Sequence, residues 1–223
     1  MREIGICDAL SSAEIARLEA IKTTTRLRPG DVILREGEPA DHLFNVKKGA
    51  IKVYKLLADG RCQITSFLFP GDFLGLAHDQ NYAFTAEALT DVEACRFART
   101  QYEAVVQACP TLERRLLATA SNELVAAQDQ MLLLGRKSAT EKVASFLLML
   151  SKRAVKRGEP ASPITLPMKR ADISDYLGLT IETVSRVLTR LKKSGVIRIL
   201  NPGRIDLLRP SALSDLAAGP GGA

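Results

Sequence analysis

The segment from Met168 to Arg186 constrains the fold of this chain more than any other. Its sequence, MKRADISDYLGLTIETVSR, places apolar residues at helical spacing up to Leu177 and then has a glycine at position 178. Glycine readily adopts the left-handed conformation that ends a helix, and Thr180 is a residue type that caps the start of the next one. We expect that second helix from about residue 181 to residue 193. Two short helices joined by such a turn predict a helix-turn-helix.

The N-terminal end of the second helix carries side chains that can recognise DNA bases. Glu182, Ser185 and Arg186 are spaced i, i+3 and i+4, so they share one face of the helix. Arg186 can donate two hydrogen bonds to guanine, Glu182 can accept from cytosine, and Ser185 can do either. An alternative is a surface ion pair on an ordinary pair of helices. The predicted DNA-binding set is Thr180, Glu182, Thr183, Ser185, Arg186 and Arg190.

The distribution of charge favours DNA binding. Residues 136–210 contain 16 Lys and Arg against 6 Asp and Glu, a net charge of +10, whereas residues 1–135 contain 15 against 18, a net charge of −3. Contact with DNA phosphates requires such a basic surface. Apolar and polar residues alternate from Val196 to Leu208 around Asn201-Pro202-Gly203, which predicts a β-hairpin. The sequence therefore predicts a winged helix-turn-helix.

The N-terminal part of the chain has the pattern of a β-rich domain. Between Thr24 and Phe97, short apolar and β-branched runs alternate with glycine-containing turns, including two Pro-Gly-Asp turns at 29–31 and 70–72. Turns at intervals of about ten residues are typical of a sandwich or jelly roll. The candidate strands include 32–34, 42–46, 50–57 and 63–69. We expect a helix over 12–22, with Ser11 or Ser12 as its cap.

Two rows of small or apolar residues repeat at intervals of seven after Pro110. Interleaved heptad rows predict a coiled-coil seam between two copies of the chain, and packing of the helix on its own domain is the alternative. A twofold dimer would present two recognition helices to a palindromic DNA site. We expect Gly135 to end the seam and a further helix to run over 139–152. The predicted dimer interface consists of Leu117, Ala120, Leu124, Ala127, Met131 and Leu134.

These segments together predict an α+β protein. Its 223 residues, 46% of them hydrophobic, can form more than one core. We expect a β-roll over 1–110, a dimerisation helix over 111–136 and a winged helix-turn-helix over 137–216. The N-terminus lacks a signal-peptide segment and no apolar run is long enough to span a membrane, so we expect a cytoplasmic protein without a membrane partner. Neither a phosphate-binding loop nor a catalytic triad pattern is present, and His42 and His78 lack metal-ligand spacing, so neither an enzyme nor a metal site is expected.

The chain resembles the CRP/FNR superfamily of bacterial transcription regulators over nearly its whole length. The segments LPMKRADISDYLGLTIETVSR, DQMLLLGRKSATEKVASFLL and LADGRCQITSFLFPGDFLG are similar to the FNR/FixK/FnrN-like branch rather than to the cyclic-AMP receptor branch. Glu182, Ser185 and Arg186 match the E-x-x-S-R recognition signature of that branch. The resemblance implies a cyclic-nucleotide-binding-like β-roll, a homodimer, a TTGAT–ATCAA-type palindrome in double-stranded DNA, contact with RNA polymerase, and a role in low-oxygen or nitrogen-oxide responses.

The resemblance also raises the question of a bound cyclic nucleotide. In the cyclic-nucleotide branch, a Gly-Glu turn and a later Arg hold the phosphate. Here Leu76 stands where that Glu would fall, and residues 81–85 contain no Arg. An anionic phosphate in a buried site without a charge partner is strongly disfavoured. Cyclic AMP is therefore not an expected ligand.

Four cysteines raise the question of an iron–sulfur cluster. FNR-type sensors hold a [4Fe–4S] cluster with four thiolates. Cys7 and Cys95 resemble the last N-terminal ligand and the central ligand, and the other two are missing. We expect no cofactor unless a cysteine pair precedes this chain. Two alternatives stay open: a redox switch at one of the cysteines, and a regulator whose β-roll ligand or cluster controls DNA binding.

Overall fold

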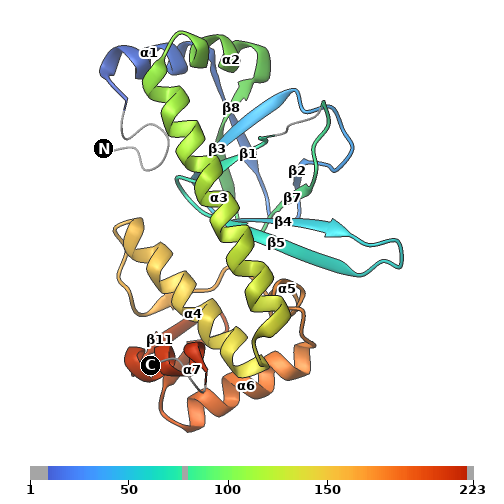
Figure 1. Cartoon of the computed structure of the whole chain (residues 1–223), viewed down its shortest axis with the longest axis vertical. Helices are drawn as coiled ribbons and strands as arrows, with labels where there is room; N and C mark the ends of the chain where they lie inside the picture. The colour runs from blue at the N-terminus through green and yellow to red at the C-terminus, as the bar shows by residue number, and fades with distance from the viewer. Residues whose placement is uncertain (1–9, 77–79, 220–223) are drawn as a thin grey trace. The chain divides into compact units, whose positions relative to one another are not determined.

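The computed structural model describes residues 10–76 and 80–219 (Figure 1). The chain divides into two compact units, Met1–Ala127 and Gln128–Ala223. The boundary falls inside one continuous helix, α3 (Pro110–Arg136). Among the described residues, no helix combines the length and the apolar content needed to cross a membrane. The sequence analysis predicted three parts, with boundaries at residues 110 and 136. The division into two units does not test those boundaries, so they stay a prediction.

The first unit contains two four-stranded antiparallel sheets. One sheet has the strand order β1-β8-β3-β6 and the other has the order β2-β7-β4-β5. This arrangement is the predicted β-roll. The strands are β1 (Lys22–Leu27), β2 (Val32–Leu34), β3 (His42–Lys48), β4 (Ile51–Leu56), β5 (Cys62–Leu68), β6 (Phe73–Leu74), β7 (Thr85–Ala88) and β8 (Val92–Ala98).

Alternation along the strands gives each sheet an apolar inner face. Phe44 and Val46 of β3 point toward the core with Ala94 of β8, while Leu43 and Cys95 lie on the opposite face. That outer face is covered by α1 (Ser12–Ile21), α2 (Arg99–Gln107) and the start of α3 (Figure 1). The buried residues between the sheets are Leu34, Ala40, Phe44, Val46, Ile51, Val53, Leu68, Leu74, Tyr82, Ala86, Ala88, Val92 and Ala94.

The two Pro-Gly-Asp turns have the same local geometry. The Asp31 carboxylate accepts the Arg28 N–H at 2.7 Å, and the Asp72 carboxylate accepts the Phe69 N–H at 2.7 Å. In each turn the aspartate side chain thus accepts the backbone N–H three residues earlier. The same three-residue sequence therefore forms the same tight turn at residues 29–31 and at residues 70–72.

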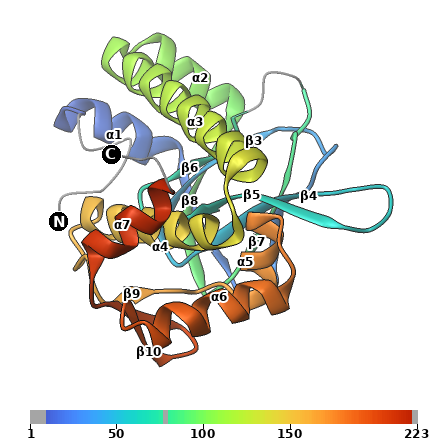
Figure 2. The same ribbon diagram turned by 60° about the horizontal axis from the view of Figure 1, so that its bottom comes forward.

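The second unit is a helical domain with a small sheet. Its helices are α4 (Ala139–Lys156), α5 (Arg170–Leu177), α6 (Ile181–Lys193) and α7 (Pro210–Ala218). The sheet has the order β10-β11-β9, from β10 (Ile197–Asn201), β11 (Arg204–Leu207) and β9 (Ile164–Thr165). α7 lies against α4, and α6 lies beside β10 (Figure 2). The predicted winged helix-turn-helix is confirmed.

Several boundaries differ from the predicted ones for local reasons. Ser11, rather than Ser12, caps α1, because its hydroxyl accepts the Glu14 N–H and the Glu14 carboxylate accepts the Ser11 N–H. Helix α3 ends at Arg136, one residue after Gly135, and the extent of the seam stays a prediction. Ser138 forms the same capping box with Glu141 and starts α4 where predicted. The sequence analysis did not single out helices α2 and α7 or strands β1, β6, β7, β8 and β9.

Candidate nucleic-acid interface

The turn between α5 and α6 has the geometry that its sequence predicts. Gly178 has φ 59° and ψ 46°, the left-handed conformation, and its N–H donates to the Ser174 carbonyl. The Leu179 N–H donates to the same carbonyl at 3.1 Å. Thr180 then caps α6 by accepting the Thr183 N–H at 3.2 Å. These contacts end one helix and start the next within three residues, which fixes the direction of α6.

Helix α6 has one buried face and one exposed face. The buried face consists of Val184, Val187, Leu188 and Leu191, at spacings of three and four residues. The predicted base-contacting residues Glu182, Ser185 and Arg186 are all exposed on the other face. Thr180 and Arg190 are exposed too, and Thr183 is half-buried. The fold therefore brings the whole predicted set onto one accessible surface.

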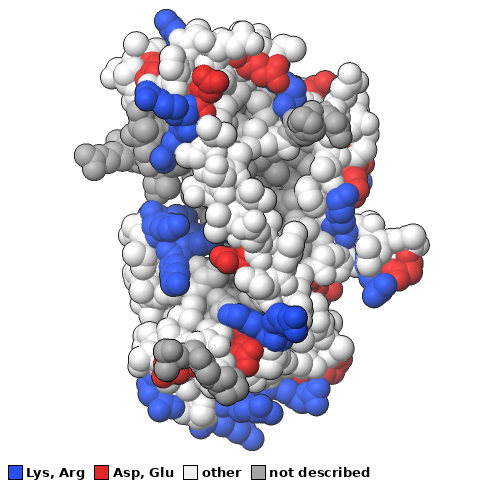
Figure 3. Space-filling view, in the orientation of Figure 1, with Lys and Arg blue, Asp and Glu red and all other residues white. Residues whose placement is uncertain are grey.

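Positive charge surrounds this surface. Figure 3 shows Lys and Arg gathered at the end of the second unit that carries α6 and the β10–β11 hairpin. Among the described residues, no carboxylate forms an ion pair with Arg186, Arg190, Lys192, Lys193 or Arg204, and all five are exposed. Exposed unpaired cations are suited to contact with phosphates.

The second unit contains two further arginines that the sequence analysis did not place in the predicted DNA-binding set. Arg209 donates from Nε to the Gly195 carbonyl at 3.2 Å and from Nη2 to the Ser194 carbonyl, so it places positive charge at the C-terminal end of α6. Arg170, at the start of α5, is half-buried, and this burial lowers the pKa of its guanidinium. Only the basic composition of the segment pointed to them.

The hydrogen bonds of Glu182 keep its carboxylate charged. Its own backbone N–H, then the Thr180 hydroxyl, and then the Arg186 charge lower the pKa of Glu182. An ionised carboxylate can only accept hydrogen bonds, and the cytosine amino group offers a donor in the major groove. Arg186 is oriented by its neighbour, since Arg186 Nη2 donates to Thr183 Oγ1 at 3.1 Å. The two ends of the recognition set thus have opposite, complementary hydrogen-bonding character.

The residues of the predicted seam are largely exposed on α3. Leu117, Leu124 and Met131 are 69%, 62% and 71% exposed, and Ala120 and Ala127 are exposed as well. Such values are unusual for large apolar side chains on one helix and are typical of a surface that another molecule covers. Leu134 differs because it is half-buried, and its Cδ2 lies 3.3 Å from where a Cβ at position 178 would be.

The segment after β6, where the cyclic-nucleotide branch holds its phosphate, lacks a suitable cation. Gly75 has φ +98°, and a Cβ there would lie 2.7 Å from the His42 carbonyl oxygen, so only glycine fits. Its own carbonyl accepts a hydrogen bond from Arg99 Nη2 at 2.6 Å. Leu76 is 48% exposed where the acid would fall, and residues 73–85 contain neither Arg nor Lys. The described residues of this segment therefore offer a phosphate no Arg or Lys side chain.

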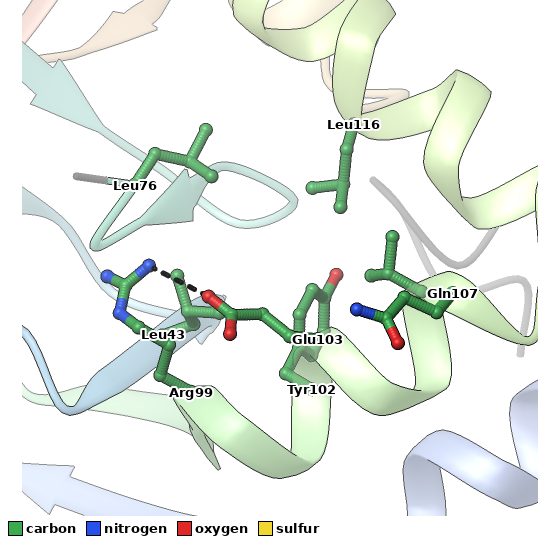
Figure 4. A pocket seen from close by; sticks show the side chains of 8 residues that line it. Leu43, Leu76, Arg99, Tyr102, Glu103, Gln107 and Leu116 are labelled. Atoms are coloured by element: carbon green, nitrogen blue, oxygen red, sulfur yellow. Dashed lines mark ion pairs between the residues drawn. The ribbon is translucent and has the colours of Figure 1, made fainter. Parts of the chain in front are cut away.

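Two small pockets lie among the described residues of the first unit. One, of about 230 Å³, lies among Leu43, Leu76, Tyr102 and Leu116, and its cation Arg99 is paired with Glu103 at 3.8 Å (Figure 4). The other, of about 260 Å³, is lined by residues that include Leu27, Phe44, Tyr82, His42 and Arg96. Arg96 Nη2 lies 2.7 Å from His42 Nε2, and burial together with the Arg96 charge lowers the pKa of His42.

The described cysteines are dispersed. Cys95 is 9% exposed on the outer face of its sheet, Cys109 is 2% exposed in the same apolar cluster, and Cys62 is half-buried at the start of β5. Cys7 and His78 lie outside the described residues. Among residues 10–76 and 80–219, no group of three or more His, Cys, Asp or Glu side chains is arranged to hold a metal ion.

Comparison with known proteins identifies both units. Residues 24–109 match the cyclic nucleotide-binding domain family, and residues 141–216 match the Crp-like helix-turn-helix domain family. The nitrogen fixation regulation protein FixK of Bradyrhizobium diazoefficiens is 41% identical over 98% of this chain and 92% of its own length. The transcriptional activator protein FnrL of Cereibacter sphaeroides is 39% identical over 89% of this chain and 82% of its own length. The solved structure of FixK2 from Bradyrhizobium japonicum is 40% identical, with a TM-score of 0.84, and the match covers 90% of this chain and 99% of that one.

A β-roll, a long helix and a winged helix-turn-helix with an exposed basic recognition surface define a DNA-binding transcription regulator. The extent of the similarity then assigns the family. The chain belongs to the CRP/FNR family of transcription regulators and is similar to its FixK-like members.

Proposed function

We propose that this regulator binds a TTGAT–ATCAA-type palindrome as a homodimer. The observation that carries the proposal is the division of α6 into a buried apolar face and an exposed face that presents Glu182, Ser185 and Arg186 together. These residue types match guanine and cytosine edges in the major groove. Thr180 and Arg190 extend the contact surface toward the DNA backbone, and Thr183 belongs to the same surface beside Arg186.

The proposed dimer uses the exposed apolar rows of α3. Leu117, Leu124 and Met131 repeat every seven residues, and each is more than three-fifths exposed. A second copy of the same helix would cover these residues, with the alanines of the other row allowing close approach. A palindrome has twofold symmetry, so a twofold dimer would place one α6 on each half-site.

We further propose that the protein works in the bacterial cytoplasm as an activator that contacts RNA polymerase and that it is not an enzyme. Relatives at 36–41% identity are named as transcriptional activators or as regulators of nitrogen fixation. A role in low-oxygen or nitrogen-oxide responses belongs to the same proposal and rests on the resemblance to the FNR/FixK/FnrN-like branch. The basic face of the second unit would be occupied by DNA, which leaves the β-roll and the remaining surface for the polymerase.

The proposed regulator needs neither a cyclic nucleotide nor a cluster. The segment after β6 has no cation for a phosphate, and Arg99 nearby is held by Glu103 and the Gly75 carbonyl. Cys95 is packed in an apolar cluster, and Cys7 is the one other cysteine that resembles a cluster ligand. Two thiolates per chain fall short of the four that a [4Fe–4S] cluster takes.

Titration of the purified protein in air against a labelled TTGAT–ATCAA duplex, with a scrambled duplex at the same salt concentration as control, tests the proposal. We expect selective binding of the palindrome. We expect Arg186→Ala to weaken binding to the palindrome by about 1–3 kcal/mol per half-site while scrambled DNA changes little. Weak or unselective binding of the wild-type protein in air would contradict a regulator that needs no cofactor. Binding restored by anaerobic iron reconstitution would favour the cluster-gated alternative instead.

A further inference from the structure

A set of hydrogen bonds at the start of α6 holds Arg186 of the recognition set. Arg186 Nη2 donates to Thr183 Oγ1 at 3.1 Å. Thr180 Oγ1, at the N-cap, donates to the same Thr183 Oγ1 at 3.0 Å. The guanidinium of Arg186 is therefore connected through the Thr183 hydroxyl to the N-cap of α6.

The hydrogen bonds of the Thr183 hydroxyl fix its place. A guanidinium can only donate, whereas a hydroxyl has one proton and two acceptor positions. Thr183 Oγ1 accepts from Arg186 and from Thr180, so both of its acceptor positions are used. Thr180 Oγ1 accepts the Thr183 backbone N–H at 3.2 Å in return, so Thr183 is bonded to the N-cap of α6 through both its side chain and its backbone.

We propose that Thr183 is a positioning residue that holds Arg186, through Thr180, in place for base recognition before DNA arrives. This inference rests on the proposed function, because it concerns how the same surface selects bases. An exposed arginine side chain has many conformations, and ordering it on binding reduces affinity. A guanidinium that is already held in the free protein avoids most of that cost, and its bidentate geometry toward guanine is set in advance.

Thr183 differs from the other threonine of α6 in a way that allows a matched control. Thr189 is exposed, and its hydroxyl donates to the Ser185 carbonyl at 2.9 Å, an ordinary contact within the helix. Thr183→Val and Thr189→Val remove the same hydroxyl and keep the same β-branched shape, so their effects on helix propensity are alike. Thr183→Ser keeps the hydroxyl and should restore the behaviour of the wild-type protein.

The first measurement is made on the full-length protein without DNA. Arg186 Nε–H is assigned by NMR, and its order parameter is compared among the wild-type protein, Thr183→Val, Thr183→Ser and Thr189→Val. We expect the order parameter to fall in Thr183→Val alone. An unchanged value in Thr183→Val would overturn the proposal whatever DNA the protein binds. Thermal unfolding of each variant shows whether the fold is retained.

The second measurement is a double-mutant cycle on DNA. We expect Thr183→Val to raise the Kd for the palindrome about tenfold, with scrambled DNA unchanged, and Thr183→Val/Arg186→Ala to bind no more weakly than Arg186→Ala. If Thr183→Val lost the same affinity for both duplexes, Thr183 would be a phosphate contact. If the losses of affinity in the two single variants were additive in the double variant, Thr183 and Arg186 would not be coupled. Either result overturns the proposal.

The two proposals can fail separately. If Arg186→Ala loses selectivity for the palindrome but Thr183→Val loses no affinity, the positioning role alone is rejected. If Arg186→Ala binds the palindrome as tightly as the wild-type protein, the proposed function itself is rejected.

Discussion

Replacement of Gly178 by alanine tests how closely the turn of the helix-turn-helix depends on one backbone conformation. Gly178 has φ 59° and ψ 46°, and a Cβ there would lie 3.3 Å from Leu134 Cδ2. The left-handed conformation costs an alanine about 1–2 kcal/mol, and crowding of a packed neighbour adds about 1 kcal/mol. We therefore expect Gly178→Ala to destabilise the second unit by about 2–3 kcal/mol. For a domain of this size, that loss lowers the Tm by roughly 10 °C or more.

Gly158→Ala is the matched control for this prediction. Gly158 also has a positive φ, +76°, but a Cβ there would meet nothing within 4 Å. Its substitution should cost the conformational part alone, about 1–2 kcal/mol. Thermal unfolding followed by circular dichroism, together with palindrome titration below the transition, compares the two variants. A Tm of Gly178→Ala equal to that of the wild-type protein would refute the argument, and so would a larger loss in Gly158→Ala.

Three further predictions concern the dimer, the pH dependence of stability and cyclic AMP. Leu124→Glu should yield monomers that bind the palindrome poorly, because the seam would bury like charges. Val155→Glu, at an exposed apolar site on α4 outside the seam, should leave the dimer intact. Sedimentation velocity distinguishes monomers from dimers. Burial and the nearby Arg96 lower the pKa of His42 below its usual 6.5, so the unfolded chain takes up a proton first as the pH falls. Stability should therefore decline as the pH falls through about 6.5, and denaturant titrations of His42→Gln should lack this part of the decline. Millimolar cyclic AMP should leave the Tm unchanged, and an increase of several degrees would show a nucleotide site that the residues after β6 do not indicate.

Local signals account for the parts of the fold that the sequence predicted well. The two helices of the helix-turn-helix were expected to end at Leu177 and to run over 181–193, and they have these bounds, because Gly178 and Thr180 act through their own backbone conformation and side chain. The same holds for the capping box of Ser138. Of the elements that were missed, α7 begins with Pro210, a residue type that favours the first position of a helix, whereas α2 and β9 have no such signal. Ala98, at the start of α2, makes no side-chain cap, and β9 is two residues long and exists through its pairing with β11.

The sequence likewise predicted one part of the candidate site and not the other. Periodicity alone predicted that Glu182, Ser185 and Arg186 share an exposed face, since it requires only the pitch of a helix. The hydrogen bonds among Thr180, Thr183 and Arg186 depend on which rotamers these side chains adopt, and no spacing rule specifies a rotamer. The role of Arg209 at the C-terminal end of α6 depends on the fold of the wing, which brings residues 194–195 and 209 together.

The end of α3 links the proposed dimer seam to the DNA-binding surface. Gln130 Nε2 donates to the Tyr176 carbonyl at 2.8 Å, and Leu134 approaches Gly178, so the last turns of α3 contact the end of α5 and the turn that follows it. Leu134 is also the last residue of the seam rows. A side chain that helps to hold two copies together would then also support the turn that directs α6. Substitutions at Leu134 should therefore affect both the dimer and base selectivity. Substitutions at Leu117, the first residue of the seam rows, should affect DNA binding only through dimerisation.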